Sequence, residues 1–224
     1  MVIEYSQFKY SDEQKKHFPS DLEGKPVMIA LDSIKINGTH GKVYKDSEDA
    51  LKDYLLREFD SKEHGTYYNW FITRDGRLYH ITPNGKAGHS CVFALYSTRM
   101  SMALPGVCPQ HKVDVKDMSN VPDKYIISIC TELSSDNDDV PLTSSQEFTL
   151  KNLIAYHIKA LNIKPSDIIS RSDLTRNAVE KELLGHKAYA NNLPALAILA
   201  SYSLMITRNE QTISLSPIDE VKVN

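Results

Sequence analysis

The chain has 224 residues, of which 41% are hydrophobic and 25% are charged, as is ordinary for a globular protein with one buried core. Its formal net charge of -3 gives no electrostatic basis for binding nucleic acid or an acidic membrane surface. No segment approaches the roughly 18 apolar residues that a membrane span needs. The N-terminus also lacks the apolar core of a signal peptide. We therefore expect no membrane span, and a chain that is either cytoplasmic or exported by a leaderless route.

The three cysteines stand at positions 91, 108 and 130, and no two of them have CxxC spacing. Cys130 lies in the apolar run IISIC, which predicts a buried thiol. Cys91 and Cys108 can form a disulfide bridge if the protein is exported, and the sequence leaves this pairing open.

The first sixty residues predict an arm, a strand and a helix. Residues 1–24 are polar and charged, so we expect an N-terminal arm with one short helix around residues 11–17, followed by one domain over residues 25–224. The continuous apolar run at residues 27–31 predicts a strand buried on both faces. Residues 46–59 predict a helix capped by Asp46 or Ser47. Its apolar stripe consists of Leu51, Tyr54, Leu55 and Phe59.

A β-hairpin is expected within residues 65–90. Residues 67–73 are aromatic and β-branched, Arg74-Asp75-Gly76 forms a tight turn, and residues 77–82 form the second strand. The glycine supplies the positive φ that such a turn requires. Residues 91–124 then predict a long, mostly irregular insertion, and loops of this length are often functional.

The second half of the chain continues to alternate strands with helices. Residues 125–133 predict a second core strand, and the T-S-S-Q capping box of Thr143 and Gln146 opens a helix that runs to residue 162. Residues 167–170 predict a short strand, residues 175–184 and 193–205 predict helices, and a polar tail follows. This order predicts a single α/β domain with a central mixed β-sheet flanked by helices.

Motifs along residues 27–174 resemble those of the N-acetylmuramoyl-L-alanine amidase family, the zinc amidase fold shared by phage lysozyme-like amidases and peptidoglycan recognition proteins. They are the tyrosine-rich strand with its RDG turn, AGHS at 87–90, SICTEL at 128–133, and LTSSQ at 142–146 leading to IISRSDL at 168–174. The resemblance implies a zinc ion held by two histidines and a third ligand. Such an ion activates water to attack the amide between muramic acid and the stem peptide.

The positions that the resemblance assigns to the zinc ligands hold other residues. Registered on the first core strand, the first position is Leu31, the second is Arg171, and the third is Asn191 or Asn192. Leucine has no donor atom, and a guanidinium stays protonated and has no lone pair to donate. We therefore predict no metal site of the family's geometry and no cofactor. Recruitment of other ligands to a metal stays open. Asp32 and Asp173 are each next to a lost ligand position, although neighbouring residues on a strand face opposite sides. The other candidates are His89, His111 and His186.

Other positions implied by the resemblance are retained. Tyr68 matches a tyrosine that supports the water and the oxyanion, Glu132 matches a possible general base, and His89 matches a histidine that lines the substrate groove. Arg171 is a candidate for pairing with Glu132 or for clamping a ligand carboxylate. Asn69 and Trp70 follow Tyr68 and are candidates for sugar or peptide contacts, although core packing is the other interpretation of Trp70.

Three functional hypotheses follow. The first is an amidase-like domain that binds peptidoglycan fragments, or a protein partner, without zinc-dependent catalysis. The second is an active peptidoglycan amidase that uses relocated metal ligands, or Glu132 with Tyr68. The third is a phage- or secretion-associated interaction protein whose contact surface is the insertion at residues 91–124.

Overall fold

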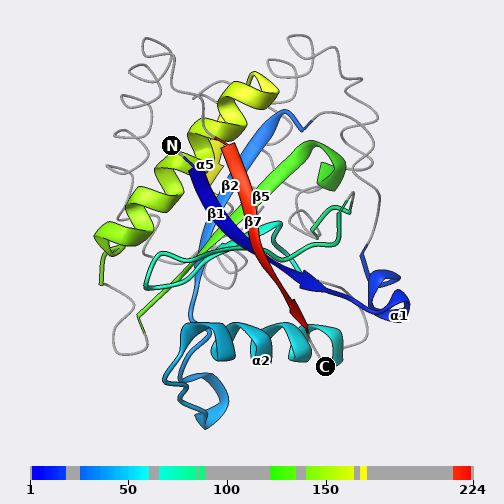
Figure 1. Ribbon diagram of the computed structural model, residues 1–224, viewed down its shortest axis with the longest axis vertical. Helices are drawn as coiled ribbons and strands as arrows, with labels where there is room; N and C mark the ends of the chain where they lie inside the picture. Colours follow the sequence, from blue (N-terminus) through cyan, green and yellow to red (C-terminus); the bar gives the residue numbers. More distant parts are fainter. Residues whose placement is uncertain are drawn as a thin grey trace, which may run out of the picture.

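The computed structural model describes residues 2–18, 26–60, 66–84, 86–88, 122–134, 140–163, 167–170 and 214–222. Within these ranges seven strands form one sheet in the order β6-β2-β5-β3-β4-β1-β7 (Figure 1). The strands are β1 (Val2–Lys9), β2 (Met28–Ile34), β3 (Trp70–Ile72), β4 (Leu78–His80), β5 (Ile126–Glu132), β6 (Ile168–Ser170) and β7 (Ser214–Lys222). The helices are α1 (Asp12–Lys15), η1 (Thr39–Gly41), α2 (Ser47–Asp60), η3 (Pro122–Tyr125) and α5 (Ser144–Leu161). The predicted α/β domain with a mixed sheet flanked by helices is confirmed.

The centre of the sheet is parallel. Strand β2 lies between β6 and β5, and β5 pairs in parallel with β3. Strand β4 then turns back antiparallel to β3, as the hairpin pattern predicts. Residues 28–33 of β2 are all buried, because strands on both sides and helices on both faces exclude water from it.

The two faces of the sheet carry separate clusters of side chains. Helix α5 covers one face, here called the α5 face, where Leu150, Leu153 and Ile154 pack against Ile29, Leu31 and Ile129. Helix α2 covers the opposite α2 face, where Leu51, Leu55 and Phe59 share a cluster with Tyr68, Phe71 and Cys130. The apolar stripe predicted for the helix at residues 46–59 and the apolar side of α5 therefore both point into the core.

Both long helices begin where the sequence indicates. The Thr143 hydroxyl accepts a hydrogen bond from the Gln146 N–H at 3.1 Å, and the Gln146 side chain accepts one from the Thr143 N–H, which completes the predicted capping box of α5. At the start of α2 the Asp46 carboxylate accepts a bond from the Glu48 N–H at 2.7 Å. Helix α5 ends at Asn162, which has a left-handed φ of 55°.

The two ends of the chain differ from their predictions. Strand β1 lies within the predicted N-terminal arm and pairs in parallel with β4, while the short helix α1 forms where it was expected. Strand β7 lies within the predicted polar tail and pairs in parallel with β1. Figure 1 shows these strands, blue and red, side by side. Each depends on a partner far away in the sequence, so its own polar composition gave little signal.

Several predictions fall outside the described residues. These are residues 91–121 of the insertion, the helices at 175–184 and 193–205, and the pairing of Cys91 with Cys108. The buried free thiol predicted for Cys130 is confirmed. No helix within the described ranges is long and apolar enough to cross a lipid bilayer.

The RDG turn requires glycine at its last position. Gly76 has φ of 87°, and a Cβ added there would lie 2.6 Å from the Cβ of Ser145 on α5. We expect Gly76→Ala to lower the free energy of unfolding by about 2–4 kcal/mol, through backbone strain and overpacking together. Gly41→Ala is the matched control, because Gly41 has φ of 74° but no atom within 4 Å of an added Cβ. It should cost only about 1–2 kcal/mol in chemical denaturation, and equal losses would contradict the predicted contact with α5.

Two histidines lie beside Trp70 on the α5 face, His157 buried and His80 half-buried. The ring centroid of Trp70 lies 4.4 Å from that of His80 and 5.8 Å from that of His157. The His157 Nε2 is buried and has no hydrogen-bond partner among the described residues. Burial lowers the pKa of His80 to about 4 and the pKa of His157 to about 3, the latter with a further contribution from His80. Both rings are therefore neutral in the folded protein near neutral pH.

This histidine pair makes folding sensitive to acid. Below pH 6.5 both histidines become protonated in the unfolded chain but stay neutral in the folded protein. The free energy of unfolding therefore decreases as the pH falls from 6.5 towards 4. We expect the free energy of unfolding to fall on the order of a few kcal/mol between pH 7.5 and 4.5. His157→Leu should flatten this slope in denaturant titrations, whereas Phe148→Ala, at an exposed position of α5, should keep it. Equal slopes in wild type and His157→Leu would contradict the prediction.

Candidate functional site

Tyr68 and Asp32 form a buried pair on the α2 face. The Tyr68 hydroxyl donates a hydrogen bond to Asp32 Oδ2 at 2.6 Å, and the Ser33 N–H donates to Asp32 Oδ1 at 2.8 Å. Each of Asp32 and Tyr68 is only 1% exposed. A 2.6 Å bond from a hydroxyl to a carboxylate has the length of a charge-assisted hydrogen bond. The pair therefore joins the central strand β2 to the segment that precedes β3.

The register of β2 places Leu31 and Asp32 on opposite faces of the sheet. Leu31 pairs with Ile129, and both belong to the cluster on the α5 face, away from Tyr68. Asp32 pairs with Cys130, which belongs to the cluster on the α2 face with Tyr68. Because neighbouring strand residues face opposite sides, the residue of β2 that meets Tyr68 is Asp32.

The Tyr68–Asp32 bond fixes the direction of donation. An ionised carboxylate only accepts hydrogen bonds, and a tyrosine carries a single hydroxyl proton. The Tyr68 proton is therefore directed at Asp32 in this structure.

Glu132, the second candidate catalytic residue, ends β5 on the same face. It lies two residues beyond Cys130, which is roughly 7 Å further along the strand. Its side chain is 2% exposed, and its Oε2 accepts a hydrogen bond from the Arg74 N–H at 2.9 Å. Burial raises the pKa of the Glu132 carboxyl, while the bonds from Arg74 and Ser47 oppose that rise. Glu132 thus holds the RDG turn.

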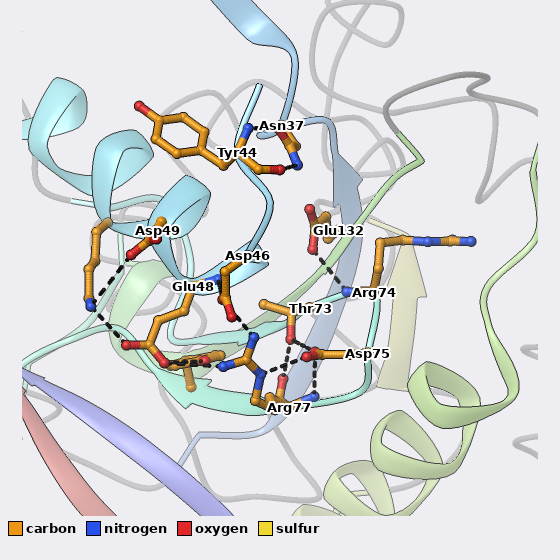
Figure 2. A network of polar contacts seen from close by, with 12 residues as sticks. Asn37, Tyr44, Asp46, Glu48, Asp49, Thr73, Arg74, Asp75, Arg77 and Glu132 are labelled. Carbon is orange, nitrogen blue, oxygen red and sulfur yellow. Dashed lines mark hydrogen bonds and ion pairs between the residues drawn. The ribbon is translucent and has the colours of Figure 1, made fainter. Parts of the chain in front are cut away.

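The RDG turn is tied to the start of α5 as well as to β5. Figure 2 shows Arg74 beside Glu132, with its backbone N–H directed at the carboxylate. The Arg74 carbonyl accepts from the Thr143 hydroxyl at 2.8 Å, and the Arg74 guanidinium donates to Gln146 Oε1 at 3.2 Å. The Gln146 amide in turn donates to the Glu132 carbonyl at 2.9 Å. We call Arg74, Glu132, Thr143 and Gln146 the turn clamp.

Arg77 connects the same turn to α2. Its guanidinium contacts Asp46 at 2.8 Å, Glu48 at 3.2 Å and Asp75 at 2.7 Å (Figure 2). The Tyr79 hydroxyl also donates to Glu48, at 3.0 Å. The Arg77 side chain is 40% exposed, so these ion pairs orient the turn relative to α2 but contribute little to the free energy of folding.

Asn69 and Trp70, the other predicted site residues that the structure describes, direct their side chains away from the Tyr68–Asp32 pair. The Asn69 side chain accepts from the Ser128 N–H at 2.9 Å and so fastens its own segment to β5. Trp70 is buried in the cluster on the α5 face, which is the core-packing alternative. His89 and Arg171 lie outside the described residues, as do Asp173, His111, His186, Asn191 and Asn192. Sequence analysis considered Asp32 only as a substitute ligand, and its pairing with Tyr68 became visible only in the register.

The described residues do not fit a zinc site of the family's geometry. No three histidine, cysteine, aspartate or glutamate side chains converge within the described ranges. Leu31 offers no donor atom and faces α5, and each Asp32 oxygen already accepts a hydrogen bond. A catalytic zinc ion needs three protein ligands and an open position.

A separate cleft of about 510 Å³ lies between β1, α1 and the loop after β4. None of the predicted site residues that the structure describes lines it. Its walls are formed by Gln7, Phe8, Lys9, Tyr10, Lys15, Pro83, Asn84 and Lys86.

Comparison with known proteins supports the fold. No protein-family model and no curated protein matches the chain. Among solved structures it is similar to PlyL, with a TM-score of 0.52 and 8% identity over 89% of this chain and 96% of that one. It is similar to Drosophila PGRP-LB, with a TM-score of 0.50 and 11% identity over 85% and 92%. It also matches the N-acetylmuramoyl-L-alanine amidase LysC from Clostridium intestinale URNW, with a TM-score of 0.48 and 16% identity over 79% and 86%.

These identities show the fold alone. The first two structures cover most of both chains, so the whole domain and not a fragment of it follows the amidase and PGRP-like architecture. The fold expected from the ordered motifs is therefore confirmed.

Substitution of Glu132 tests whether it acts as an acceptor within the fold. Glu132→Gln keeps an oxygen for the Arg74 N–H and removes a charge that burial disfavours, so we expect stability at pH 7 to be equal to or above that of the wild type. Glu132→Ala leaves the Arg74 N–H unsatisfied and should cost about 1–3 kcal/mol. Chemical denaturation of both variants measures this difference, and a Gln variant as unstable as the Ala variant would contradict it.

Proposed function

We propose that this chain is an amidase-like domain that binds peptidoglycan fragments, or a protein partner, without the zinc-dependent catalysis of the amidase family. The fold and the ordered motifs support descent from a domain that handles peptidoglycan. The arginine at position 171, which the resemblance assigns to a zinc ligand, supports binding without zinc, because a guanidinium has no lone pair to donate.

The Tyr68–Asp32 hydrogen bond is the observation that carries this proposal. In a working amidase site a tyrosine that assists the reaction needs its proton for the substrate or for the water. Here the Tyr68 proton is directed at Asp32 at 2.6 Å. The carboxylate of Glu132, the candidate base, accepts a hydrogen bond from the Arg74 N–H. The backbone carbonyl of Glu132 accepts one from Gln146, so the residue is bonded twice within the turn clamp. Both candidate catalytic groups therefore serve contacts inside the domain.

One observation favours the second hypothesis, an active hydrolase with relocated ligands. Asp32 places a carboxylate on the same face as Tyr68, and carboxylate oxygen is an accepted zinc ligand. Under this hypothesis Asp32 would supply a ligand that Leu31 does not. The third hypothesis depends on residues 91–124, almost all of which lie outside the described residues.

The proposal is tested with the full chain and a purified muropeptide, that is, muramic acid carrying its stem peptide. We expect calorimetric binding that survives EDTA, and no release of stem peptide on chromatography with or without added zinc. The Tyr68→Phe variant should likewise release no stem peptide. Release of stem peptide that EDTA abolishes and zinc restores would establish the second hypothesis instead. Binding of neither muropeptide nor intact peptidoglycan would remove peptidoglycan as the ligand and leave the protein partner.

A further inference from the structure

We propose that Asp32 takes the place of the metal as the partner of Tyr68, so that the Tyr68–Asp32 hydrogen bond is a metal-independent lock at the centre of the domain. Asp32 is then a positioning residue that holds the Tyr68 hydroxyl. This inference goes beyond the proposed function, because it does not depend on which ligand the domain binds.

The burial of Asp32 is the first step. A carboxylate at 1% exposure on a central strand is costly unless donors reach its oxygens. The Ser33 N–H and the Tyr68 hydroxyl do so from two directions, at 2.8 and 2.6 Å. Removing either donor would leave part of a buried charge unsatisfied.

The backbone around Tyr68 is fixed as closely as its hydroxyl. The Tyr68 N–H donates to the Thr66 hydroxyl at 3.1 Å, and the next residue, Asn69, donates its N–H to the Ser128 carbonyl at 2.9 Å. Gly88 lies so close that an added Cβ would be 2.9 Å from the Tyr68 carbonyl carbon. The ring therefore reaches Asp32 from a preorganised position.

The β2 side of the bond is equally constrained. Asp32 stands opposite Cys130 in the parallel ladder of β2 and β5. On the other face of these strands the Ser33 and Thr131 hydroxyls lie 2.6 Å apart in a buried hydrogen bond. This contact resists a shift of β2 against β5, and such a shift by one residue would exchange Asp32 for a residue facing α5.

These contacts give the Tyr68 hydroxyl a fixed hydrogen-bond acceptor on β2, the Asp32 carboxylate. We infer that this acceptor stands where a metal centre would otherwise face Tyr68. The donor set differs from a zinc site in one decisive respect. The Tyr68 proton is directed towards the carboxylate, whereas a tyrosine beside a metal-bound water must keep that proton for the water or for the substrate. The hydrogen bond therefore replaces the metal's role as partner and does not prepare a site for it.

The lock is tested by a double-mutant cycle of Asp32→Asn and Tyr68→Phe, measured by chemical denaturation with EDTA and with equimolar zinc. Each single variant should raise the unfolding equilibrium constant about tenfold or more, because a hydrogen bond to a buried charge is lost. The double variant should be less destabilised than the product of the two single effects, by about tenfold. Both results should be the same with EDTA and with zinc. Effects that simply multiply, or a coupling that appears only with zinc, would overturn the proposal.

A spectroscopic measurement on the wild-type protein covers the case in which a variant does not fold. The bonded Tyr68 hydroxyl should give a slowly exchanging proton resonance in NMR that EDTA does not change. This resonance should persist in Tyr67→Phe, the matched control, and be absent in Tyr68→Phe. Zinc that remains bound at one equivalent through dialysis, with loss of this resonance, would assign Asp32 to a metal instead. Failure of muropeptide binding would leave the lock intact, whereas zinc bound at Asp32 would count against both proposals, so the two failures are distinguishable.

Discussion

Buried carboxylates that must find hydrogen-bond donors constrain this structure more than any other feature. Asp32 and Glu132 are 1% and 2% exposed, and both lie on the α2 face of the sheet. Water cannot solvate them there, so the protein itself has to supply the donors. Asp32 receives Tyr68 and the Ser33 N–H, and Glu132 receives the Arg74 N–H. The bonds from Tyr68 and Arg74 each connect a central strand to the hairpin segment, whereas the bond from Ser33 lies within β2.

The same constraint bears on function. A catalytic tyrosine or glutamate has to release or receive a proton at the substrate, which requires that its hydrogen-bonding capacity be available there. In this domain the proton of Tyr68 and an oxygen of Glu132 are used to fasten the hairpin. The side chains that most resemble catalytic ones therefore contribute to the architecture, and this is the basis on which we propose recognition without turnover.

Local signals were sufficient to predict most of the elements around this site. The Thr143–Gln146 capping box, the apolar run of β2 and the Asp75-Gly76 turn each specify structure through neighbours in sequence. Long-range pairing was not predictable in this way. Strands β1 and β7 are polar segments whose partners lie far away in the sequence, because β1 pairs with β4 and β7, and β7 pairs with β1. The same holds for the residue of β2 that meets Tyr68. A shift of the strand register by one residue moves every side chain to the opposite face, so the sequence alone could not show that this residue is Asp32 and not Leu31.

The chain shares its fold with PlyL and Drosophila PGRP-LB at only 8% and 11% sequence identity. Its described contacts show which interactions hold this fold together. A fold held by a structural metal depends on its ligands, since metal binding then supplies folding free energy. Here the described contacts that join the hairpin to α2, α5 and β5 include hydrogen bonds and ion pairs of Arg74 and Arg77, in addition to the ladder between β3 and β5. Each contact of Arg74 and Arg77 depends on at least one side chain. None of these contacts requires a metal ion, so the hairpin is joined to its neighbours by the protein's own groups.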